Sequence, residues 1–251
     1  MTNKLITIEN IYKNFGGKGK SNFETLKDVS FNIIKEEFLV LLGPSGCGKS
    51  TILRLLSELD QPSSGKITYE KDFSKEKMSF VFQQSAVFPW LTVGQNVELD
   101  LIGDKVPKEK RKILVKEELK EFGLEKFVKY RPRDLSGGLK QRVGLARAFV
   151  TGPKLIFLDE PFSELDIFTA EELRRELLRL WKKHDSTVVM VSHNIDEAIE
   201  LADRIVVFSA RPGQIKGIIK NELPRPRNPR SKEFFDMQDE IRALLKPENL
   251  E

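Results

Sequence analysis

Cysteine and long apolar runs are nearly missing from this sequence. Its 251 residues include a single cysteine, so the chain cannot form an internal disulfide, which agrees with a reducing compartment. No apolar stretch approaches the roughly 18 to 20 residues that cross a bilayer. Residues 1–8 alternate in polarity as a β-strand does, whereas a signal peptide runs apolar. We therefore predict that the protein stays in the cytoplasm.

An excess of charge of one sign is missing as well. The 42 basic and 38 acidic residues give a formal net charge of +4, and 39% hydrophobic with 32% charged residues is ordinary for a globular protein. Basic residues gather only in residues 223–230, where arginine alternates with proline. This pattern is typical of an extended linker. Because no aromatic side chain is interleaved with it, we expect no nucleic-acid partner.

The most informative segment is a glycine-rich loop that follows the apolar run 38–42. It has the pattern G-x-x-x-x-G-K-[ST] of a phosphate-binding loop, and an apolar helical pattern follows it. Its glycines allow consecutive backbone N–H groups to point at the phosphates of a nucleoside triphosphate. Lys49 is expected to reach the β- and γ-phosphates, and Ser50 to ligate Mg²⁺. A ligand-free turn is the alternative, but the order of strand, loop and helix argues against it. The predicted loop residues are Gly43, Pro44, Ser45, Gly46, Cys47, Gly48, Lys49, Ser50 and Thr51.

Two adjacent carboxylates end a second apolar run, residues 155–158. Pro161 prevents this predicted strand from continuing. The segment resembles a Walker B strand, in which Asp159 holds Mg²⁺ directly or through water and Glu160 orients or deprotonates the attacking water. Such a pair alone is more often a solvated turn. The phosphate loop upstream favours the catalytic interpretation.

A third segment, residues 135–142 (LSGGLKQR), resembles the signature motif of ATP-binding cassette (ABC) ATPases. Ser136, Gly137 and Gly138 stand at a predicted helix start and offer hydrogen-bond donors to an anion. A helix cap alone is the structural alternative, since serine is a favoured N-cap residue. The resemblance implies a head-to-tail homodimer, in which each ATP lies between the phosphate loop of one subunit and the signature motif of the other.

The same resemblance assigns four further residues. Phe15 matches the aromatic residue that stacks on adenine, with Tyr12 as a weaker candidate, and Gln83 matches the glutamine that contacts Mg²⁺ and the attacking water, although Gln84 stands beside it. Asp166 matches the aspartate of the D-loop. His193 matches the switch histidine that contacts the γ-phosphate.

Three other residues near these motifs carry their own expectations. Glu164 departs from the alanine that is usual in the D-loop. The second histidine, His184, is expected in an exposed turn. The thiol of Cys47 is expected to be reactive, because a helix start and Lys49 favour the thiolate.

Residues 88–97 resemble the import cassettes for nitrate, sulfonate, taurine and related small solutes. This resemblance implies transmembrane permease subunits as partners, with a periplasmic or extracellular solute-binding protein acting indirectly, and a peripheral location on the inner face of the membrane. Phe88 and Trp90 either pack under a loop or form a docking surface for the permease. An ABC exporter or extractor, and a soluble ABC ATPase linked to nucleic acid, are the alternative functions.

The predicted fold is an α/β P-loop NTPase of the ABC type, with a mixed sheet core, an antiparallel β subdomain and a helical subdomain. Residues 3–42 are expected to supply strands of the antiparallel sheet, and residues 89–150 the helical subdomain. We predict an ATPase domain over residues 1–220. Residues 221–251 would then form a Pro/Arg linker and a C-terminal amphipathic helix.

Overall fold

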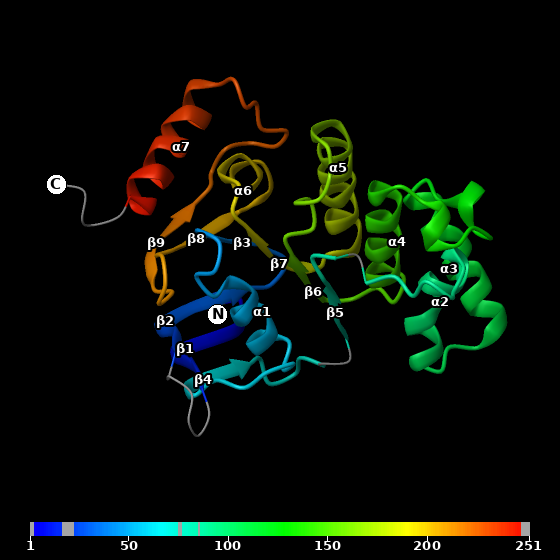
Figure 1. Ribbon diagram of the computed structural model, residues 1–251, viewed down its shortest axis with the longest axis horizontal. Coiled ribbons are helices and arrows are strands. Elements are labelled where there is room, and N and C mark those ends of the chain that lie inside the picture. Colours follow the sequence, from blue (N-terminus) through cyan, green and yellow to red (C-terminus); the bar gives the residue numbers. More distant parts are fainter. Residues whose placement is uncertain (1–2, 17–22, 75–76, 85, 247–251) are drawn as a thin grey trace. The chain divides into compact units, whose positions relative to one another are not determined.

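The computed structural model describes residues 3–16, 23–74, 77–84 and 86–246. The chain divides into two compact units (Figure 1): unit 1 comprises residues 1–74 and 187–251, and unit 2 comprises residues 75–186. Residues 247–251 of the predicted C-terminal region lie outside the described residues. The domain boundary at about residue 220 stays a prediction.

Unit 1 contains an antiparallel sheet in which β1 lies between β2 and β4. Their bounds are β1 Lys4–Phe15, β2 Phe23–Ile34 and β4 Ser64–Tyr69. Alternating burial along β1 and β2 shows that one face packs on the core, as the alternating sequence predicts.

A second sheet in unit 1 is mainly parallel. Strand β3 (Phe38–Leu42) pairs in parallel with β7 (Thr187–Ser192) and β8 (Arg204–Phe208), and β9 (Ile215–Lys220) adds to β8 antiparallel. All residues of β3 and β7 are buried. The expectation that residues 38–42 belong to the antiparallel sheet is therefore wrong. Burial on both faces suits a central parallel strand, and the continuous apolar run already carried that signal.

The described residues of unit 1 form three α-helices. They are α1 Lys49–Leu56, α6 Ile195–Leu201 and α7 Lys232–Leu245. Helix α7 has the expected amphipathic character: Phe234 and Ile241 are fully buried, whereas Phe235 is exposed. It packs on α6 and β8 (Figure 1).

Unit 2 is mostly helical. Its strands β5 (Met78–Val81) and β6 (Leu155–Asp159) pair in parallel. Its α-helices are α2 Val93–Gly103, α3 Lys108–Glu121, α4 Gly137–Phe149 and α5 Ile167–His184, and two short 3₁₀ turns, Glu125–Phe127 and Pro132–Asp134, lie between α3 and α4. Gly123, with φ of +63°, follows the end of α3. None of the helices in the described part of the chain is long and apolar enough to cross a membrane.

Candidate functional site

The phosphate loop is a tight turn between β3 and α1. Gly46 and Gly48 have φ of +77° and +104°, which disfavour any side chain. At Gly48 a Cβ atom would also lie 2.7 Å from Cδ2 of Leu26. The loop therefore requires glycine for its backbone shape and for its packing on β2.

Lys49 is buried inside this loop. Its Nζ donates to the carbonyl oxygens of Gly43, at 2.7 Å, and Pro44, at 2.9 Å, and the residue is only 4% exposed. Among the described residues no carboxylate forms an ion pair with it. Nζ of Lys49 also lies 3.8 Å from Sγ of Cys47. A buried ammonium held by neutral acceptors has unused attraction for an anion, which suits a phosphate group.

His193 leaves the sheet at the same edge as the phosphate loop. Leu42 is paired with Ser192 in the parallel register of β3 and β7, so Gly43 and His193 both follow the carboxyl ends of neighbouring strands. Ligands of open α/β sheets bind at this edge. Within unit 1 the structure thus brings the predicted switch histidine next to the predicted phosphate loop.

A segment distant in sequence supports the phosphate loop from behind. The N–H of Gly213 donates to the carbonyl oxygen of Thr25, and that of Lys27 to Gly213. A Cβ atom at Gly213 would lie 2.1 Å from the carbonyl oxygen of Cys47. Position 213 requires a glycine because the phosphate loop lies against it. Sequence reasoning missed this role.

Cys47 does not have the environment predicted for it. Burial raises the pKa of its thiol, and this outweighs the nearby charge of Lys49, which lowers the pKa. The residue is 1% exposed. The expected reactive thiolate is wrong, because the loop turns this side chain toward the protein.

The predicted adenine contact, Phe15, lies at the end of β1. Its ring is 45% exposed, and the ammonium of Lys13 lies 4.8 Å from the ring centroid. Tyr12, the weaker candidate, is half-buried. An exposed ring at a strand end is available for stacking on a base.

In unit 2, β5 and β6 deliver Gln83 and Glu160 to one edge. Val81 is paired with Leu158, so both residues follow the strand ends two positions later. Ser163 bridges them: its hydroxyl donates to the carbonyl oxygen of Glu160 at 3.0 Å and accepts from Nε2 of Gln83 at 3.5 Å. The structure therefore brings the predicted glutamine next to the predicted catalytic carboxylate.

Glu160 has an unusual backbone conformation. Its φ is +45°, in the left-handed region that residues with a side chain seldom occupy. Such conformations persist where the surroundings hold them and are frequent at active sites. Asp159, directly before it, is 6% exposed at the end of β6.

The signature motif and the D-loop residue both cap helices in unit 2. Ser136 caps α4, and its hydroxyl accepts from the N–H of Leu139 at 3.4 Å. Asp166 caps α5, accepting from the N–H of Thr169 at 3.0 Å, and hydrogen bonds from Thr169 lower its pKa. A Cβ atom at Gly138 would lie 2.6 Å from Cγ2 of Thr169, so the two helix starts lie side by side.

Comparisons with known proteins identify the family of this chain. The sequence profile of the ABC transporter family matches residues 26–163. The chain belongs to the ABC transporter family. The aliphatic sulfonates import ATP-binding protein SsuB of Bacillus cereus is 39% identical over 240 residues, which are 94% of each chain. An uncharacterized ABC transporter ATP-binding protein of Methanocaldococcus jannaschii, MJ0412, is 41% identical over 248 residues, 98% of this chain and 92% of that one.

A solved ABC cassette shows the same fold. The dimeric structure of MJ0796, in a post-hydrolysis state bound to ADP and Pi, superimposes with a TM-score of 0.76 at 34% identity, covering 87% of this chain and 99% of that chain. The predicted α/β fold of the ABC type is thereby confirmed.

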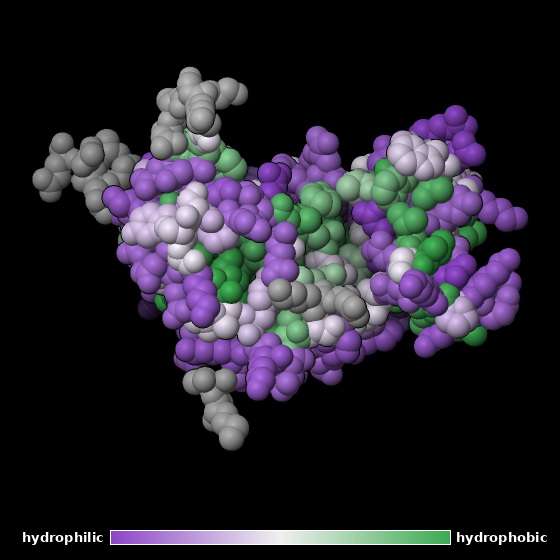
Figure 2. Space-filling view, turned by 90° about the horizontal axis from the view of Figure 1, so that it is seen from below, coloured by the Kyte–Doolittle hydropathy of each residue, from purple (hydrophilic) through white to green (hydrophobic). Residues whose placement is uncertain are grey.

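In this ABC cassette, the loop between β5 and α2 exposes a large aromatic residue. Trp90 is 66% exposed, and its ring lies 5.4 Å from that of Phe88. Of the two alternatives for Trp90, packing under the loop is wrong. Apolar residues (green) also interrupt the hydrophilic surface over the helices of unit 2, at the right of Figure 2.

Asn96 gives this aromatic loop its shape, a role that sequence reasoning missed. Its side chain is fully buried; Oδ1 accepts from the N–H of Phe88 at 2.7 Å, and Nδ2 donates to carbonyl oxygens of Phe88, Leu91 and Thr92. An asparagine can satisfy several backbone groups at once in this way. The Asn96 side chain therefore holds the backbone of the loop that carries Trp90, here called the Trp90 loop.

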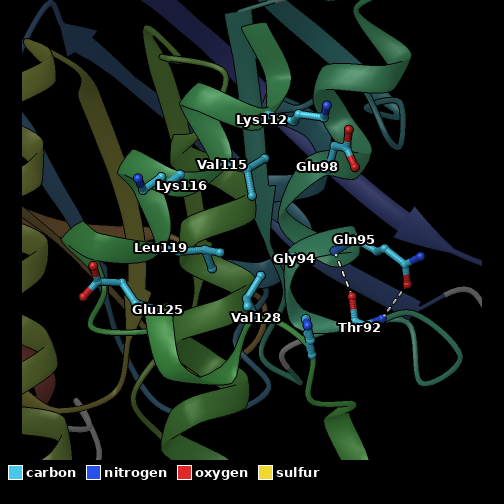
Figure 3. A pocket seen from close by; sticks show the side chains of 11 residues that line it. Thr92, Gly94, Gln95, Glu98, Lys112, Val115, Lys116, Leu119, Glu125 and Val128 are labelled. Atoms are coloured by element: carbon cyan, nitrogen blue, oxygen red, sulfur yellow. Dashed lines mark hydrogen bonds between the residues drawn. The ribbon is translucent and has the colours of Figure 1, made fainter. Parts of the chain in front are cut away.

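A pocket of about 480 Å³ lies in unit 2 beside that loop in sequence (Figure 3). Its apolar floor is formed by Val115, Leu119 and Val128, and charged side chains stand around it. The other lining residues are Thr92, Gly94, Gln95, Glu98, Lys112, Lys116, Glu125 and Lys129.

His184 does not lie in an exposed turn. It is the last residue of α5, half-buried, with its ring 5.7 Å from that of Phe149. Burial lowers the pKa of His184. The expectation failed because the charged neighbours in sequence gave no indication of the aromatic ring from α4.

Proposed function

We propose that the chain is the ATP-hydrolysing subunit of an ABC importer that takes up a small solute through separate membrane subunits. The observation that carries this proposal is the phosphate loop with buried Lys49, in a chain 39% identical to an aliphatic sulfonates import subunit. The solute-binding protein and the location on the inner membrane face follow from the same proposal. No observation favours an exporter or a nucleic-acid-linked ATPase.

The proposed chemistry assigns each residue one task. Phe15 stacks on adenine, the backbone N–H groups of residues 45–51 bind the phosphates, and Lys49 carries the compensating charge. Glu160 accepts a proton from the attacking water. His193 donates to the γ-phosphate, whose oxygens gain charge as the bond breaks.

The residues proposed to hold Mg²⁺ fit this ion. Ser50, Gln83 and Asp159 supply the oxygen ligands that Mg²⁺ prefers. The Nε2 of Gln83 is used by Ser163, so the amide oxygen remains for the ion. When bound, Mg²⁺ neutralises charge on the phosphates.

The proposed partner for Ser136, Gly137, Gly138 and Asp166 is a second copy of this chain, arranged head to tail. Two observations support it: the related cassette MJ0796 is dimeric, and Ile167 and Phe168, next to Asp166, are 80% and 83% exposed. Glu164 is also exposed there, and nothing in the structure explains its departure from alanine.

The proposed surface for the permease is the Trp90 loop with the pocket between α2 and α3. Exposed Trp90 offers a large contact area on a backbone held by Asn96, and the pocket has the apolar floor and polar rim of a protein interface. An apolar side chain of a short permease helix would fill it.

The experiment compares Trp90→Ala with the wild type, each as the isolated chain and together with a candidate permease in lipid vesicles. Trp90→Ala should keep the ATPase activity of the isolated chain and lose its stimulation by the permease, because truncating a buried interface tryptophan costs about 2 kcal/mol or more, roughly thirtyfold in affinity. The matched control is Phe235→Ala, an exposed aromatic residue of α7 in unit 1. Normal stimulation of Trp90→Ala would refute the docking surface, and no ATP hydrolysis by the wild type would refute the function.

A further inference from the structure

Helix α6 is too short to be stable without tertiary partners. It has seven residues, begins two residues after His193, and is capped by Asn194, which accepts from the N–H groups of Asp196 and Glu197. Isolated helices of this length do not persist in water. The position of His193 therefore depends on what holds α6 in place.

The loop before α6 is fastened to its first turn. The hydroxyl of Ser192 donates to the Glu197 carboxylate at 2.8 Å and accepts from the N–H of Asn194 at 3.0 Å. His193 stands between these two bonded residues. Movement of the first turn of α6 is therefore transmitted to His193.

The C-terminal segment supplies hydrogen bonds to the other end of α6. NH1 of Arg227 lies 2.7 Å from the carbonyl oxygen of Ile199, 3.1 Å from that of Glu200 and 2.7 Å from that of Ala202. Arg225 binds the carbonyl oxygen of Leu201. The last carbonyl groups of a helix have no hydrogen-bond partner within the helix. Here side chains of residues 221–227 donate the missing hydrogen bonds.

Asn221 and Asp203 complete this attachment. Nδ2 of Asn221 donates to the carbonyl oxygen of Ile199 at 2.8 Å, and Arg225 forms an ion pair of 2.5 Å with Asp203. Asp203 in turn accepts from the N–H of Phe38 in β3 at 2.9 Å. The segment is thus bound to the central sheet as well as to α6.

Arg227 is a structural arginine and not a solvated linker residue. It is 8% exposed, and burial lowers its pKa to about 10. A guanidinium tolerates burial where its N–H groups donate hydrogen bonds, as those of Arg227 do to three carbonyl oxygens. The expectation of a plain linker at residues 223–230 is incomplete for this reason.

Helix α7 contacts the first turn of α6. Nε2 of Gln238 donates to the carboxylate of Asp196, and Gln238 is 7% exposed. Phe234 and Ile241 are buried on the same helix. The C-terminal region therefore holds both ends of the helix that follows His193.

We propose that residues 221–245 form a clamp that positions His193 for ATP hydrolysis, with Arg227 and Gln238 as its positioning residues. This inference rests on the proposed function, specifically on the role of His193 at the γ-phosphate. It predicts that the clamp controls the hydrolytic step and leaves nucleotide binding by the phosphate loop unchanged.

The test uses the full chain and three variants: Arg227→Ala, the milder Gln238→Ala, and Arg242→Ala as a control. Arg242 is an exposed residue of α7 whose NH1 lies 3.3 Å from Asp239. Arg227→Ala should lower kcat about tenfold with KM for ATP within about twofold, which separates a transition-state effect from uniform binding. Hydrogen exchange of the amides in α6 should rise about tenfold. Gln238→Ala should show the same changes at about threefold, and Arg242→Ala none.

A double-mutant cycle with His193→Ala tests the route of the effect. In that background Arg227→Ala should change kcat less than about twofold, because the group being positioned is gone. An equal loss in both backgrounds, or unchanged exchange in α6, would overturn the clamp. If His193→Ala alone keeps wild-type kcat, the proposed role of His193 fails. Hydrogen exchange of the α6 amides in Arg227→Ala then decides separately whether residues 221–245 hold α6 in place. If Arg227→Ala does not fold, Gln238→Ala in the same cycle gives the decision.

Discussion

The two units present their candidate residues in opposite ways. In unit 1 the phosphate loop is complete within its unit: Lys49 is 4% exposed, its ammonium is bonded to the loop, Gly48 packs against the Leu26 side chain, and Gly213 packs against the backbone of Cys47. In unit 2 the signature motif faces outward, and a Cβ atom at Gly137 would meet no described atom within 4 Å. We therefore expect the phosphate loop of unit 1 to bind a small anion and the signature motif of unit 2 to contact a larger partner.

The roles of the two units are distinguished most clearly by removing the proposed base, Glu160, from unit 2 and leaving the phosphate loop of unit 1 unchanged. Glu160→Gln should retain ATP affinity and lower kcat about a thousandfold, because a general base is lost while the phosphate contacts stay. ATPase assays and nucleotide-binding titrations measure the two effects. A variant that keeps more than about a tenth of the wild-type rate would contradict the assignment. Glu164→Gln, which changes another carboxylate of unit 2, is the control.

Cys47 tests how closed the phosphate loop is. Since burial raises the pKa of its thiol, maleimide should label the native chain at pH 7 about a hundredfold more slowly than the chain unfolded in guanidinium. Mass spectrometry over time gives both rates. Similar rates in the two states would mean that the thiol is accessible and that the loop is open.

The outward surface of unit 2 is tested at Phe168, beside Asp166. In the Glu160→Gln background with Mg-ATP, Phe168→Ser should weaken the proposed dimer about tenfold to thirtyfold, because a large apolar contact is lost. Analytical ultracentrifugation measures the dissociation constant. Phe235→Ser, at an exposed residue of α7, is the control and should leave the dissociation constant unchanged. If Phe168→Ser also leaves the constant unchanged, Phe168 does not belong to the interface.

The interior of unit 2 is tested at Glu118, which is 7% exposed and whose Oε1 has no hydrogen-bond partner among the described residues. Burial raises its pKa to about 7, with Glu121 and Glu117 adding to the rise and Lys183 and Arg179 opposing it. The folded state therefore holds the proton more tightly than the unfolded state. The stability from this group is complete below pH about 4.5 and is lost as pH rises through about 7.

Glu118→Gln should consequently stabilise the chain at pH 8.5 by about 1 to 2 kcal/mol and have little effect at pH 5. Thermal unfolding at both pH values measures the difference. Glu117→Gln, a change at the exposed neighbouring residue, should show no such pH dependence. An equal effect of Glu118→Gln at both pH values would contradict the raised pKa.

The contiguous motifs of both units were predictable from sequence because each carries its geometry in neighbouring residues. The glycines of residues 43–51 impose the turn, and the apolar runs before Gly43 and Asp159 predict the strands that present them. Strand order then places His193 beside Gly43, and Gln83 beside Glu160. The roles assigned to these residues in ATP hydrolysis stay predictions.

The residues that sequence reasoning missed act through contacts outside regular secondary structure, with nearby loop residues for Asn96 and with residues distant in sequence for Arg227 and Gly213. Asn96 holds a loop by side-chain bonds to the backbone, Arg227 binds carbonyl groups of a helix, and Gly213 admits the backbone of Cys47. None has a local pattern, because its partners become neighbours only after folding. The errors at Cys47 and His184 have the same origin: both side chains are more buried than their neighbours in sequence suggest, and burial is a property of the folded chain. Burial also raises the pKa of Cys47 and lowers that of His184.

The approach of Gly213 to Cys47 limits how this cassette can be recombined with its relatives. The part matched by the family profile, residues 26–163, contains the phosphate loop and lacks the backbone segment that lies behind it. In a chimera that exchanges only this part, the phosphate loop and the segment around Gly213 would come from two different proteins. Exchange of residues 209–214 together with the loop preserves the contact, so the smallest transferable unit of this cassette is discontinuous in sequence.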